Sequence, residues 1–364
     1  MIKKKLAYIN YDCFLDTDLT VLKELSKYYQ IIWIPILKEG SNFCGDSFLK
    51  NYAYENNINI KIYKYNFRFR SPKNLKLFYD ISKVIKQHNC EILITACDNI
   101  YWTIVSSIFL RNVLIITGIH DVIPHSGFKS SMLISLSLKI SIFTKDNFIF
   151  YSKNQMDIFN KKYKKNTFYV GMSYKDFGNS NINLEPISNG VKLLFFGRID
   201  SYKGLDILIH NLEILYRENI QNIQLTIAGR GPFWDKCSPL IKTNKLYNLK
   251  IRFIDNKEIP DLMCQHHFLV LPYRDATQSG PVMIAVRYNM PIIAPNWGCF
   301  SEIYTSESAL LYESNDLIGA LKRCSIMTND EYQKMKINCI NNKENYSEEK
   351  IVSNYVSFTE NLLK

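Results

Sequence analysis

Short apolar runs alternate with amphipathic segments along this chain of 364 residues, and the alternation occurs twice. The first series lies before residue 171, and the second lies after residue 190. Short apolar strands that alternate with helices predict a parallel sheet covered by helices on both faces. A chain of this length suits two domains of roughly 150 to 180 residues rather than one core. We therefore predict an α/β protein with two doubly wound domains.

The domain boundaries follow from where the periodicity is lost. The stretch 172–190 is polar and contains Asn, Ser, Gly and Pro, so it is expected to be an interdomain linker. The expected strands of the N-terminal domain, 1–171, are 5–9, 31–36, 58–63, 92–95, 113–117, 148–151 and 168–170. Those of the C-terminal domain, 191–345, are 191–196, 223–228, 249–254, 268–271, 291–294 and 309–312. The chain is helical from 316 onward, and 346–364 forms the last helix.

Charge is distributed unevenly between the two halves. Residues 1–180 contain 25 Lys and Arg against 14 Asp and Glu, whereas the remainder contains 20 of each, so the net charge of +11 lies in the first half. Such a field favours a polyanion or an anionic membrane surface as a neighbour. A lysine-rich surface that reflects sequence bias explains the same numbers equally well.

The segment 61–79 of the basic half interleaves cations with aromatic residues. This mixture suits the headgroup region of a bilayer, and it would also suit single-stranded nucleic acid. A solvated strand and loop is the plain alternative. We take the membrane or acceptor side as the hypothesis and expect no nucleic acid partner. Its candidate residues are Lys61, Lys64, Arg68 and Arg70.

Other sequence features exclude several protein classes. The basic start is followed by an apolar run that stops at Asn10, so no secretory signal is expected. The most apolar segment, 132–143, is too short for a membrane span and is interrupted by Lys139. The nine cysteines contain no CxxC pair and are expected to be reduced and mostly buried. We therefore expect a cytoplasmic protein.

The motif FGRIDSYKG, residues 196–204, follows an expected strand. Gly197 lets the backbone approach a ligand, while Arg198 offers a bidentate fork and Lys203 a mobile ammonium. Together the two cations can neutralise a diphosphate. Without such a ligand, the motif would be a turn with two surface cations. A second glycine turn, AGRGP at 228–232, follows the next strand.

The stretch LPYRDATQSGPVMIAVRYNMPIIAPNW, residues 271–297, combines a strand end, a loop and a helix. Pro281 and the hydroxyls before it are helix-start signals. The start of such a helix attracts anions, so a phosphate-bearing ligand could dock there. A capped helix after a buried strand, without a ligand, accounts for the same pattern. In the N-terminal domain, His120 and Asp121 follow the strand 113–117, where they could reach a ligand or be structural.

These motifs, in this order and spacing, resemble those of retaining nucleotide-sugar glycosyltransferases with two facing Rossmann-like domains, the GT-B architecture, and specifically glycosyltransferase family 4. The resemblance covers residues 191–303 most clearly. It implies that the last helix crosses back to the N-terminal domain. It also implies roles for residues here: Arg198 and Lys203 on the donor diphosphate, and His120 near the reacting carbon of the donor sugar. The remaining donor-binding residues that it implies are Gly197, Gly229, Arg230, Gly231, Ile254, Asp255, Asn256, Asp275, Thr277, Gln278, Ser279 and Gly280.

The chain departs from the family at two positions. Two glutamates eight residues apart are usual around this helix, and Ala276 and Ile284 occupy their places. Neither can accept a hydrogen bond through its side chain. Asp275 could replace the first glutamate, and nothing nearby replaces the second. The ATQSG form resembles a variant used in bacterial surface-polysaccharide assembly.

We therefore expect a glycosyltransferase that moves a sugar from a nucleotide-diphosphate-sugar donor to a hydroxyl of a lipid-diphosphate-linked oligosaccharide, in polysaccharide, capsule or O-antigen biosynthesis. It would work as a peripheral protein at the inner face of the cell membrane. No DxD-type acidic pair stands in the loops, so neither a metal nor another cofactor is expected. Two alternatives remain open: a nucleotide-sugar epimerase, with Asp275, Asp121 and Glu302 as its candidate carboxylates, and a non-catalytic polyanion-binding protein.

Overall fold

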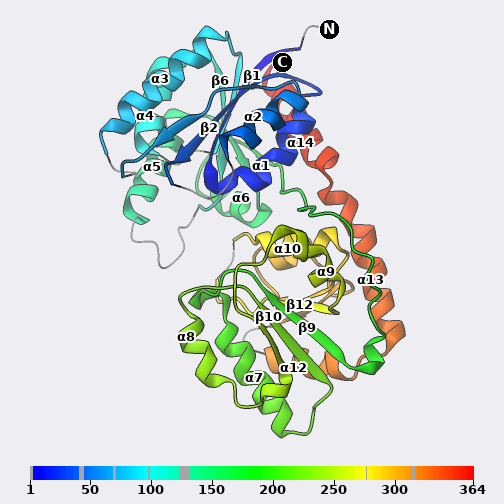
Figure 1. Cartoon of the computed structure of the whole chain (residues 1–364). Helices are drawn as coiled ribbons and strands as arrows, with labels where there is room; N and C mark the ends of the chain where they lie inside the picture. Colours follow the sequence, from blue (N-terminus) through cyan, green and yellow to red (C-terminus); the bar gives the residue numbers. More distant parts are fainter. Residues whose placement is uncertain are drawn as a thin grey trace. The chain divides into compact units, whose positions relative to one another are not determined.

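The computed structural model divides the chain into two compact units (Figure 1). The first unit comprises Met1–Ser173 and Glu348–Lys364, and the second comprises Tyr174–Ser347. The predicted linker residues from Tyr174 onward therefore belong to the second unit. The residues that the structure describes are 3–40, 45–68, 71–96, 99–122, 131–275, 277–313 and 316–364.

The first unit is built on a parallel sheet with the order β3-β2-β1-β5-β6-β7-β8, and β4 also pairs with β2. Central strand β1 buries five consecutive residues, as expected for a sheet covered on both faces. The predicted strand 58–63 is two short strands instead, because the chain leaves the ladder between Ile60 and Tyr63. The strands are β1 (Lys5–Tyr11), β2 (Gln30–Lys38), β3 (Asn59–Ile60), β4 (Tyr63–Tyr65), β5 (Ile92–Thr95), β6 (Leu114–Ile119), β7 (Asn147–Phe150) and β8 (Asn166–Tyr169).

Helices cover both faces of this sheet because side chains of β1 point alternately to opposite sides. Leu6 and Tyr8 pack with α1 (Leu15–Leu25), α2 (Asp46–Glu55) and α14 (Glu348–Leu362). Ala7 and Ile9 pack with α3 (Lys73–Gln87) and α4 (Ile100–Phe109). Helix α5 (Ser131–Thr144) packs beside α4, and α6 (Lys153–Asn160) lies between β7 and β8 in the chain. The doubly wound fold predicted for this half is confirmed.

The last helix, α14, completes the core of the first unit. Its apolar side chains, including Ile351 and Tyr355, are buried with those of β1 and α1. The Phe358 ring stacks on Phe168 with centroids 5.2 Å apart. The Asn354 side-chain amide donates a hydrogen bond of 3.0 Å to the Val170 carbonyl. The prediction that this helix returns to the N-terminal domain is confirmed.

The second unit contains a six-stranded parallel sheet with the order β11-β10-β9-β12-β13-β14. Its strands are β9 (Val191–Phe196), β10 (Ile223–Ala228), β11 (Tyr247–Lys250), β12 (Phe268–Val270), β13 (Ile292–Pro295) and β14 (Ala309–Tyr312). Its helices are α7 (Leu205–Arg217), α8 (Trp234–Cys237), α9 (Ile259–Cys264), α10 (Gly280–Arg287), α11 (Cys299–Ile303), α12 (Leu317–Ser325) and α13 (Asn329–Lys343). The predicted strand 249–254 is wrong in its second half. Residues 251–254 lie outside the sheet, where Arg252 forms two hydrogen bonds with the Glu258 carboxylate.

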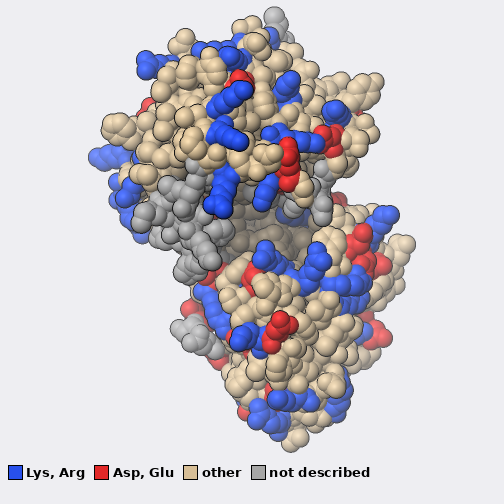
Figure 2. All heavy atoms as spheres, turned by 60° about the vertical axis from the view of Figure 1, so that its left-hand side comes forward, with Lys and Arg blue, Asp and Glu red and all other residues tan. Residues whose placement is uncertain are grey.

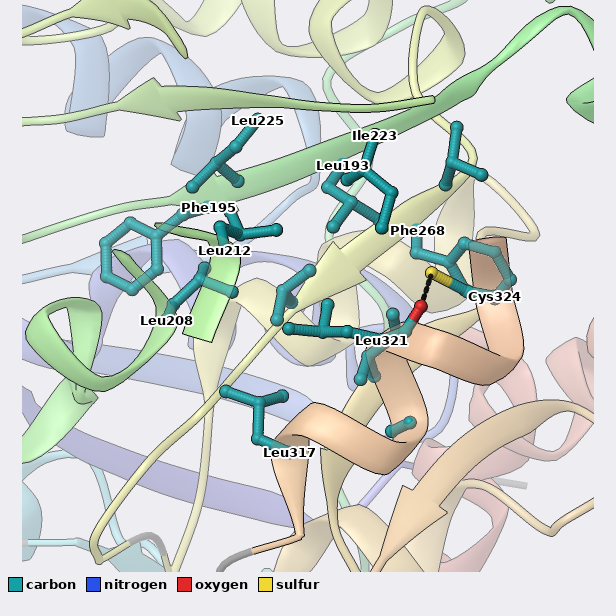
Figure 3. Close-up of a cluster of buried hydrophobic side chains, with 14 of the residues drawn as sticks. Leu193, Phe195, Leu208, Leu212, Ile223, Leu225, Phe268, Leu317, Leu321 and Cys324 are labelled. Atoms are coloured by element: carbon teal, nitrogen blue, oxygen red, sulfur yellow. Dashed lines mark hydrogen bonds between the residues drawn. The ribbon is translucent and has the colours of Figure 1, made fainter. Parts of the chain in front are cut away.

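The core of the second unit lies between the sheet and helices α7 and α12 (Figure 3). Leu193 and Phe195 of β9 are fully buried there with Leu208 of α7 and Leu321 of α12. Each such side chain contributes about 1.5 to 3 kcal/mol by leaving water. The Cys324 thiol donates a hydrogen bond of 3.1 Å to the Leu321 carbonyl, as Figure 3 shows. This packing fixes the strand ends from which the loops of the candidate site emerge.

No helix within the described ranges combines the length and the apolarity that a membrane span requires.

Candidate functional site

Three loops of the second unit meet at the carboxyl ends of neighbouring strands. Strand β9 lies between β10 and β12, so the loops that follow these three strands are adjacent. They start at Gly197, Gly229 and Leu271. Parallel α/β sheets bind ligands at this edge. The structure therefore brings together the three motifs that the sequence singled out in this half of the chain.

Glycines let these loops pack backbone against backbone. A β-carbon on Gly229 would lie 1.9 Å from the Gly197 carbonyl oxygen, and one on Gly231 would lie 2.2 Å from that of Ile199. A β-carbon on Gly204 would lie 2.0 Å from the Pro272 carbonyl oxygen. Any larger residue at these positions would push the loops apart. The glycines of FGRIDSYKG and AGRGP therefore set the close spacing of the loops.

Lys203 is a buried cation at the centre of this arrangement. Only 6% of its surface is exposed. A β-carbon built on Gly197 would lie 3.0 Å from the Lys203 Nζ and 3.6 Å from Cγ of Pro281. Lys203 and the first turn of α10 are therefore neighbours of Gly197. Within the described ranges, Lys203 forms no hydrogen bond through Nζ and no salt bridge. Burial lowers the pKa of Lys203, and Tyr202 and Asp200 oppose this shift. An ammonium held in this way favours an anionic ligand.

Helix α10 begins beside Lys203. Its N-cap, Ser279, has an extended backbone and makes no capping hydrogen bond with its side chain, and the first turn contains no acidic residue. The Ser279 hydroxyl is buried and has no hydrogen bond of normal geometry to any described residue. Burial raises the pKa of Tyr273, and the nearby Ser279 hydroxyl partly offsets this rise. The positive end of the α10 dipole is therefore not neutralised by its own first turn.

A pocket of about 520 Å³ adjoins Gly197. Arg198, Arg230 and Arg252 line it. The Arg230 guanidinium lies 5.7 Å from the centroid of the Phe253 ring, and Arg252 forms two hydrogen bonds, of 2.6 and 2.5 Å, with the Glu258 carboxylate. The complete lining is Phe196, Gly197, Arg198, Gly229, Arg230, Gly231, Pro232, Arg252, Phe253 and Ile254. Cations and an aromatic ring around a cavity suit a nucleotide.

Arg198 differs from Lys203 in its environment. Its side chain is 70% exposed, and its Nε lies 2.8 Å from the Asp200 carboxylate. Such an exposed pair is worth about 0 to 1 kcal/mol, so a phosphate can compete for the guanidinium. Arg198 and Lys203 thus lie on either side of Gly197, one at the pocket and one at the start of α10.

Some predicted donor-binding residues lie outside the pocket. The Asp255 carboxylate accepts a hydrogen bond of 3.0 Å from the Lys257 amide in a capping box with Glu258, and Asn256 is exposed. Neither residue lines the cavity, although Ile254 does.

The loop before α10 contains three further predicted residues, Asp275, Thr277 and Gln278, all partly buried. Ala276 lies outside the described residues. Ile284 is buried within α10, so its side chain serves packing rather than recognition.

His120 lies directly after β6 in the first unit. Its ring is stacked between Phe14, with centroids 4.1 Å apart, and Tyr151, with centroids 4.3 Å apart. Gly118 makes room for this stack, because a β-carbon there would lie 2.5 Å from the Tyr151 hydroxyl. Two aromatic neighbours fix the plane of the imidazole, as a positioned polar group requires. Asp121 follows and is partly exposed.

The basic and aromatic segment of the first unit keeps its described cations at the surface. Lys61, Lys64 and Arg68 are exposed, and Lys64 pairs there with Asp46 at 2.7 Å. The Arg68 carbonyl closes a turn by accepting a hydrogen bond from the Ser71 amide. Arg70 lies outside the described residues.

The sequence motifs missed two residues of the site. Lys175 belongs to the aperiodic stretch 172–190, and no local pattern marks it, but its Nζ lies 3.5 Å from the position of a β-carbon on Gly280. Tyr273 is buried, and its ring centroid is 5.4 Å from Nζ of Lys203. Its place between a strand end and the TQSG loop was the available signal.

For metals, the described residues contain no group of three or more His, Cys, Asp or Glu side chains placed to hold one ion.

Comparison with known proteins bears on this site. Residues 190–326 match the family described as Glycosyl transferases group 1. An uncharacterized 41.2 kDa protein in the cps region of Klebsiella pneumoniae is 27% identical over 113 residues. That alignment covers 31% of this chain and 30% of the relative, so the chain spans less than a third of the curated protein that it matches.

Three solved structures share the fold over almost the whole chain. A glycosyltransferase from Rickettsia africae ESF-5 has a TM-score of 0.74 at 15% identity, covering 100% of this chain and 99% of that one. The lipopolysaccharide outer core galactosyltransferase WaaB, in its apo form, has a TM-score of 0.71 at 13% identity, covering 98% and 99%. A putative UDP-N-acetylglucosamine 2-epimerase from Listeria monocytogenes has a TM-score of 0.65 at 11% identity, covering 99% and 97%.

These similarities support the fold and the domain separately. The solved structures are all below 25% identity and establish the GT-B fold. The family match covers the part of the second unit that contains β9, β10, β12 and their loops. Residues 190–326 are therefore a glycosyl transferases group 1 domain, and the sequence-based prediction of a glycosyltransferase is confirmed at the level of this domain.

Proposed function

We propose that the chain is a retaining glycosyltransferase of the family 4 type, which moves a sugar from a nucleotide-diphosphate-sugar donor to a hydroxyl of a lipid-diphosphate-linked oligosaccharide. The observation that carries the proposal is Lys203. Its ammonium is buried without a salt bridge to any described carboxylate, at the start of a helix and next to an arginine-lined pocket. A diphosphate is the ligand that fits such a site.

The donor would be held along one line of residues. The nucleoside would occupy the pocket lined by Arg230, Phe253 and Ile254. The diphosphate would pass Gly197, where a side chain would obstruct it, and would meet Arg198 and Lys203 on either side. As the bond between the sugar's anomeric carbon and the diphosphate oxygen breaks, negative charge develops on the diphosphate. Two cations and the start of α10 stabilise that charge.

The acceptor side of the proposal draws on the first unit and on the names of similar proteins. The Klebsiella pneumoniae relative is named for the cps region, and WaaB is named as a lipopolysaccharide outer core galactosyltransferase. Both names support surface-polysaccharide, capsule or O-antigen assembly as the context. His120 keeps its proposed role as a contact of the donor sugar near the reacting carbon, because its stacked ring has a fixed orientation.

Exposed apolar and basic side chains of the first unit support the proposal of a lipid-linked acceptor. Helices α4 and α5 pack together and leave large apolar side chains exposed, among them Ile108 at 53% and Phe143 at 88%. Helices α3 and α5 and the turn after α4 also carry exposed cations, namely Lys76, Lys83, Lys86, Arg111 and Lys139. Figure 2 turns this side of the molecule forward and shows basic side chains spread among uncharged ones. Exposed apolar side chains together with exposed cations suit an anionic bilayer surface.

An epimerase of the same fold is the second candidate, because the Listeria monocytogenes structure bears that name. It would need carboxylates on both sides of the sugar ring. The candidates Asp275 and Glu302 belong to the second unit and Asp121 to the first. A group 1 domain over residues 190–326 favours transfer over epimerisation.

The test is a panel of nucleotide sugars with different bases, scored by the rise in melting temperature of the purified chain. The donor that raises it is then incubated with lipid-diphosphate-linked glycans, and the products are analysed by mass spectrometry. Transfer requires release of the nucleoside diphosphate and a larger glycan. Interconversion of the free donor sugar without an acceptor would instead identify an epimerase. A chain that no nucleotide sugar stabilises would be a polyanion-binding protein without a donor site.

A further inference from the structure

We propose that Lys175 is a donor-binding residue, and that its ammonium and that of Lys203 form a two-cation anion site at the start of α10. The inference rests on the proposed function, because it names a further group for the same donor. The ligand is an anion that the first turn of α10 can meet. Two sources have this chemistry: the sugar-bearing phosphate of the diphosphate, or a carboxylate on the transferred sugar.

The position of Lys175 follows from how its segment is attached to α10. The Lys175 amide donates a hydrogen bond of 3.3 Å to the Met283 carbonyl. The next residue, Asp176, pairs with Arg287 at 2.7 Å, near the end of the same helix. The main chain is thus anchored along α10, and the side chain reaches back to its start. There Nζ lies 3.5 Å and Cε 3.9 Å from the position of a β-carbon on Gly280.

Lys203 approaches the same turn from another loop. A β-carbon on Gly197 would contact both the Lys203 ammonium, at 3.0 Å, and Pro281, at 3.6 Å. Gly280 and Pro281 are consecutive residues in the first turn of α10. Two lysines from separate loops therefore have their ammonium groups near the first turn of α10.

The start of α10 favours an anion, because the positive end of the helix dipole lies there and the first turn contains no acidic residue. The Lys203 ammonium is buried and has no salt bridge to any described carboxylate, which is a second and independent indication that a ligand belongs here. The Ser279 hydroxyl, buried and without a normal hydrogen bond to any described residue, adds a neutral donor at the same place. Their combination is that of a built anion site.

Lys175 would also act on specificity. A diphosphate alone is already met by Arg198, Lys203 and the helix dipole. A third cation from the segment that enters the second unit extends the positive region toward the sugar side of the donor. Donors with an acidic sugar would then gain more from Lys175 than donors with a neutral one.

The experiment compares the full chain with Lys175→Gln, which keeps most of the side-chain length but removes the charge. Lys322→Gln is the matched control, because Lys322 is an exposed lysine of the same unit that pairs with Glu218. Lys175→Arg tests for rescue by the charge. The probes are inorganic pyrophosphate, four nucleoside diphosphates, and the glucose and glucuronate nucleotide sugars of the base that binds, each followed by calorimetry.

We expect Lys175→Gln to weaken binding of at least one probe by about tenfold, while Lys322→Gln binds as the wild type and Lys175→Arg recovers affinity. A loss for pyrophosphate and nucleoside diphosphates identifies the phosphate as the anion. A loss confined to the glucuronate donor identifies the carboxylate. If Lys175→Gln binds every probe like the wild type, the inference fails while the donor site stands. A wild type that binds none of the probes overturns both the inference and the proposed function.

Discussion

The Lys203 ammonium lies 5.4 Å from the centroid of the Tyr273 ring, a favourable contact for a buried cation. A cation–π contact contributes about 0.5 to 2 kcal/mol. Burying a charge without a partner costs several kcal/mol. The free protein therefore carries a net cost at Lys203, which an anionic ligand would remove. The second unit is destabilised at the point where its ligand is expected to bind.

Replacing Lys203 by Met should separate stability from binding. Methionine has a similar length and no charge, so we expect the melting temperature to stay the same or rise, because the desolvation cost disappears. Stabilisation by pyrophosphate and by nucleoside diphosphates should be lost. Differential scanning fluorimetry with and without these ligands measures both effects.

The pH dependence provides a check on the same residue. Burial lowers the pKa of Lys203, so its ammonium deprotonates at a lower pH than an ordinary lysine. Wild-type affinity for pyrophosphate should therefore fall as the pH rises toward the usual lysine range, and bound pyrophosphate should raise the pKa and cause proton uptake. For the substitution described above, the diphosphate role is ruled out if pyrophosphate or nucleoside diphosphates still stabilise the Lys203→Met protein.

A β-carbon at Gly229 should disrupt the joined loops. Gly229→Ala places this carbon 1.9 Å from the Gly197 carbonyl oxygen, so one loop must move. Gly178→Ala is the control, because Gly178 also has a positive φ, of 102°, but nothing lies within 4 Å of the added carbon. We expect a cost of about 1 kcal/mol for the control, from backbone strain alone, and a clearly larger cost for Gly229→Ala. Urea unfolding measures both; equal costs would contradict the loop packing described above.

His266 should make the second unit sensitive to acid. Burial lowers the pKa of His266 to about 4, and its ring bonds the Leu262 carbonyl and the Thr226 hydroxyl, each at 2.7 Å. The unfolded chain takes up the proton near pH 6.5, whereas the folded chain does so only near pH 4. The stability contributed by neutral His266 is therefore complete above pH 6.5 and is lost as the pH falls toward 4, by up to about 3 kcal/mol.

The measurement is the free energy of unfolding of the wild type and of His266→Gln between pH 7.5 and 4.5. Glutamine can hydrogen-bond but does not titrate, so the variant should lose less stability on acidification. Burial lowers the pKa of His267 as well, but this residue is present in both proteins and cancels in the difference. Parallel pH profiles would show that His266 is not responsible.

The exposed apolar side chains of α4 and α5 should contribute to binding at membranes. Ile108→Ser with Phe143→Ser removes two of them, and we expect about tenfold weaker binding to vesicles that contain phosphatidylglycerol, from the loss of apolar contact. Ile326→Ser is the control, because Ile326 is 80% exposed in the second unit. Sedimentation with vesicles measures the bound fraction. The proposed surface is wrong if the double variant and the control bind alike.

Much of the fold was predictable because buried parallel strands are continuous apolar runs. The predicted strands 92–95, 191–196, 223–228 and 309–312 agree with the observed residues at both ends. The run 249–254 looked equally strand-like, but its strand, β11, is an edge strand, and Arg252 and Glu258 form a separate turn there. Ion pairs between residues six apart cannot be read from apolar periodicity.

The candidate site was predictable where glycine and charge coincide within a few residues, as at Gly197, Arg198 and Lys203. It was not predictable where a residue arrives from a distant part of the chain. Lys175 lies at α10 because its segment is attached to that helix, in part by the pair of Asp176 and Arg287, which are 111 positions apart and give no local signal. The local role of Asp255 could not be read from the motif either, because its carboxylate accepts a hydrogen bond from the Lys257 amide and caps its own turn.

The chain enters the second unit at Tyr174 and is about to leave it at Tyr346, where the Tyr174 amide donates a hydrogen bond of 2.9 Å to the Tyr346 carbonyl. The second unit is thus an insertion whose two ends meet. During synthesis on the ribosome, every strand of the first unit emerges early, but α14, which closes its core, emerges only after the whole insertion. The core of the first unit therefore lacks α14 until synthesis of the second unit is finished, whereas the second unit can fold before α14 is made.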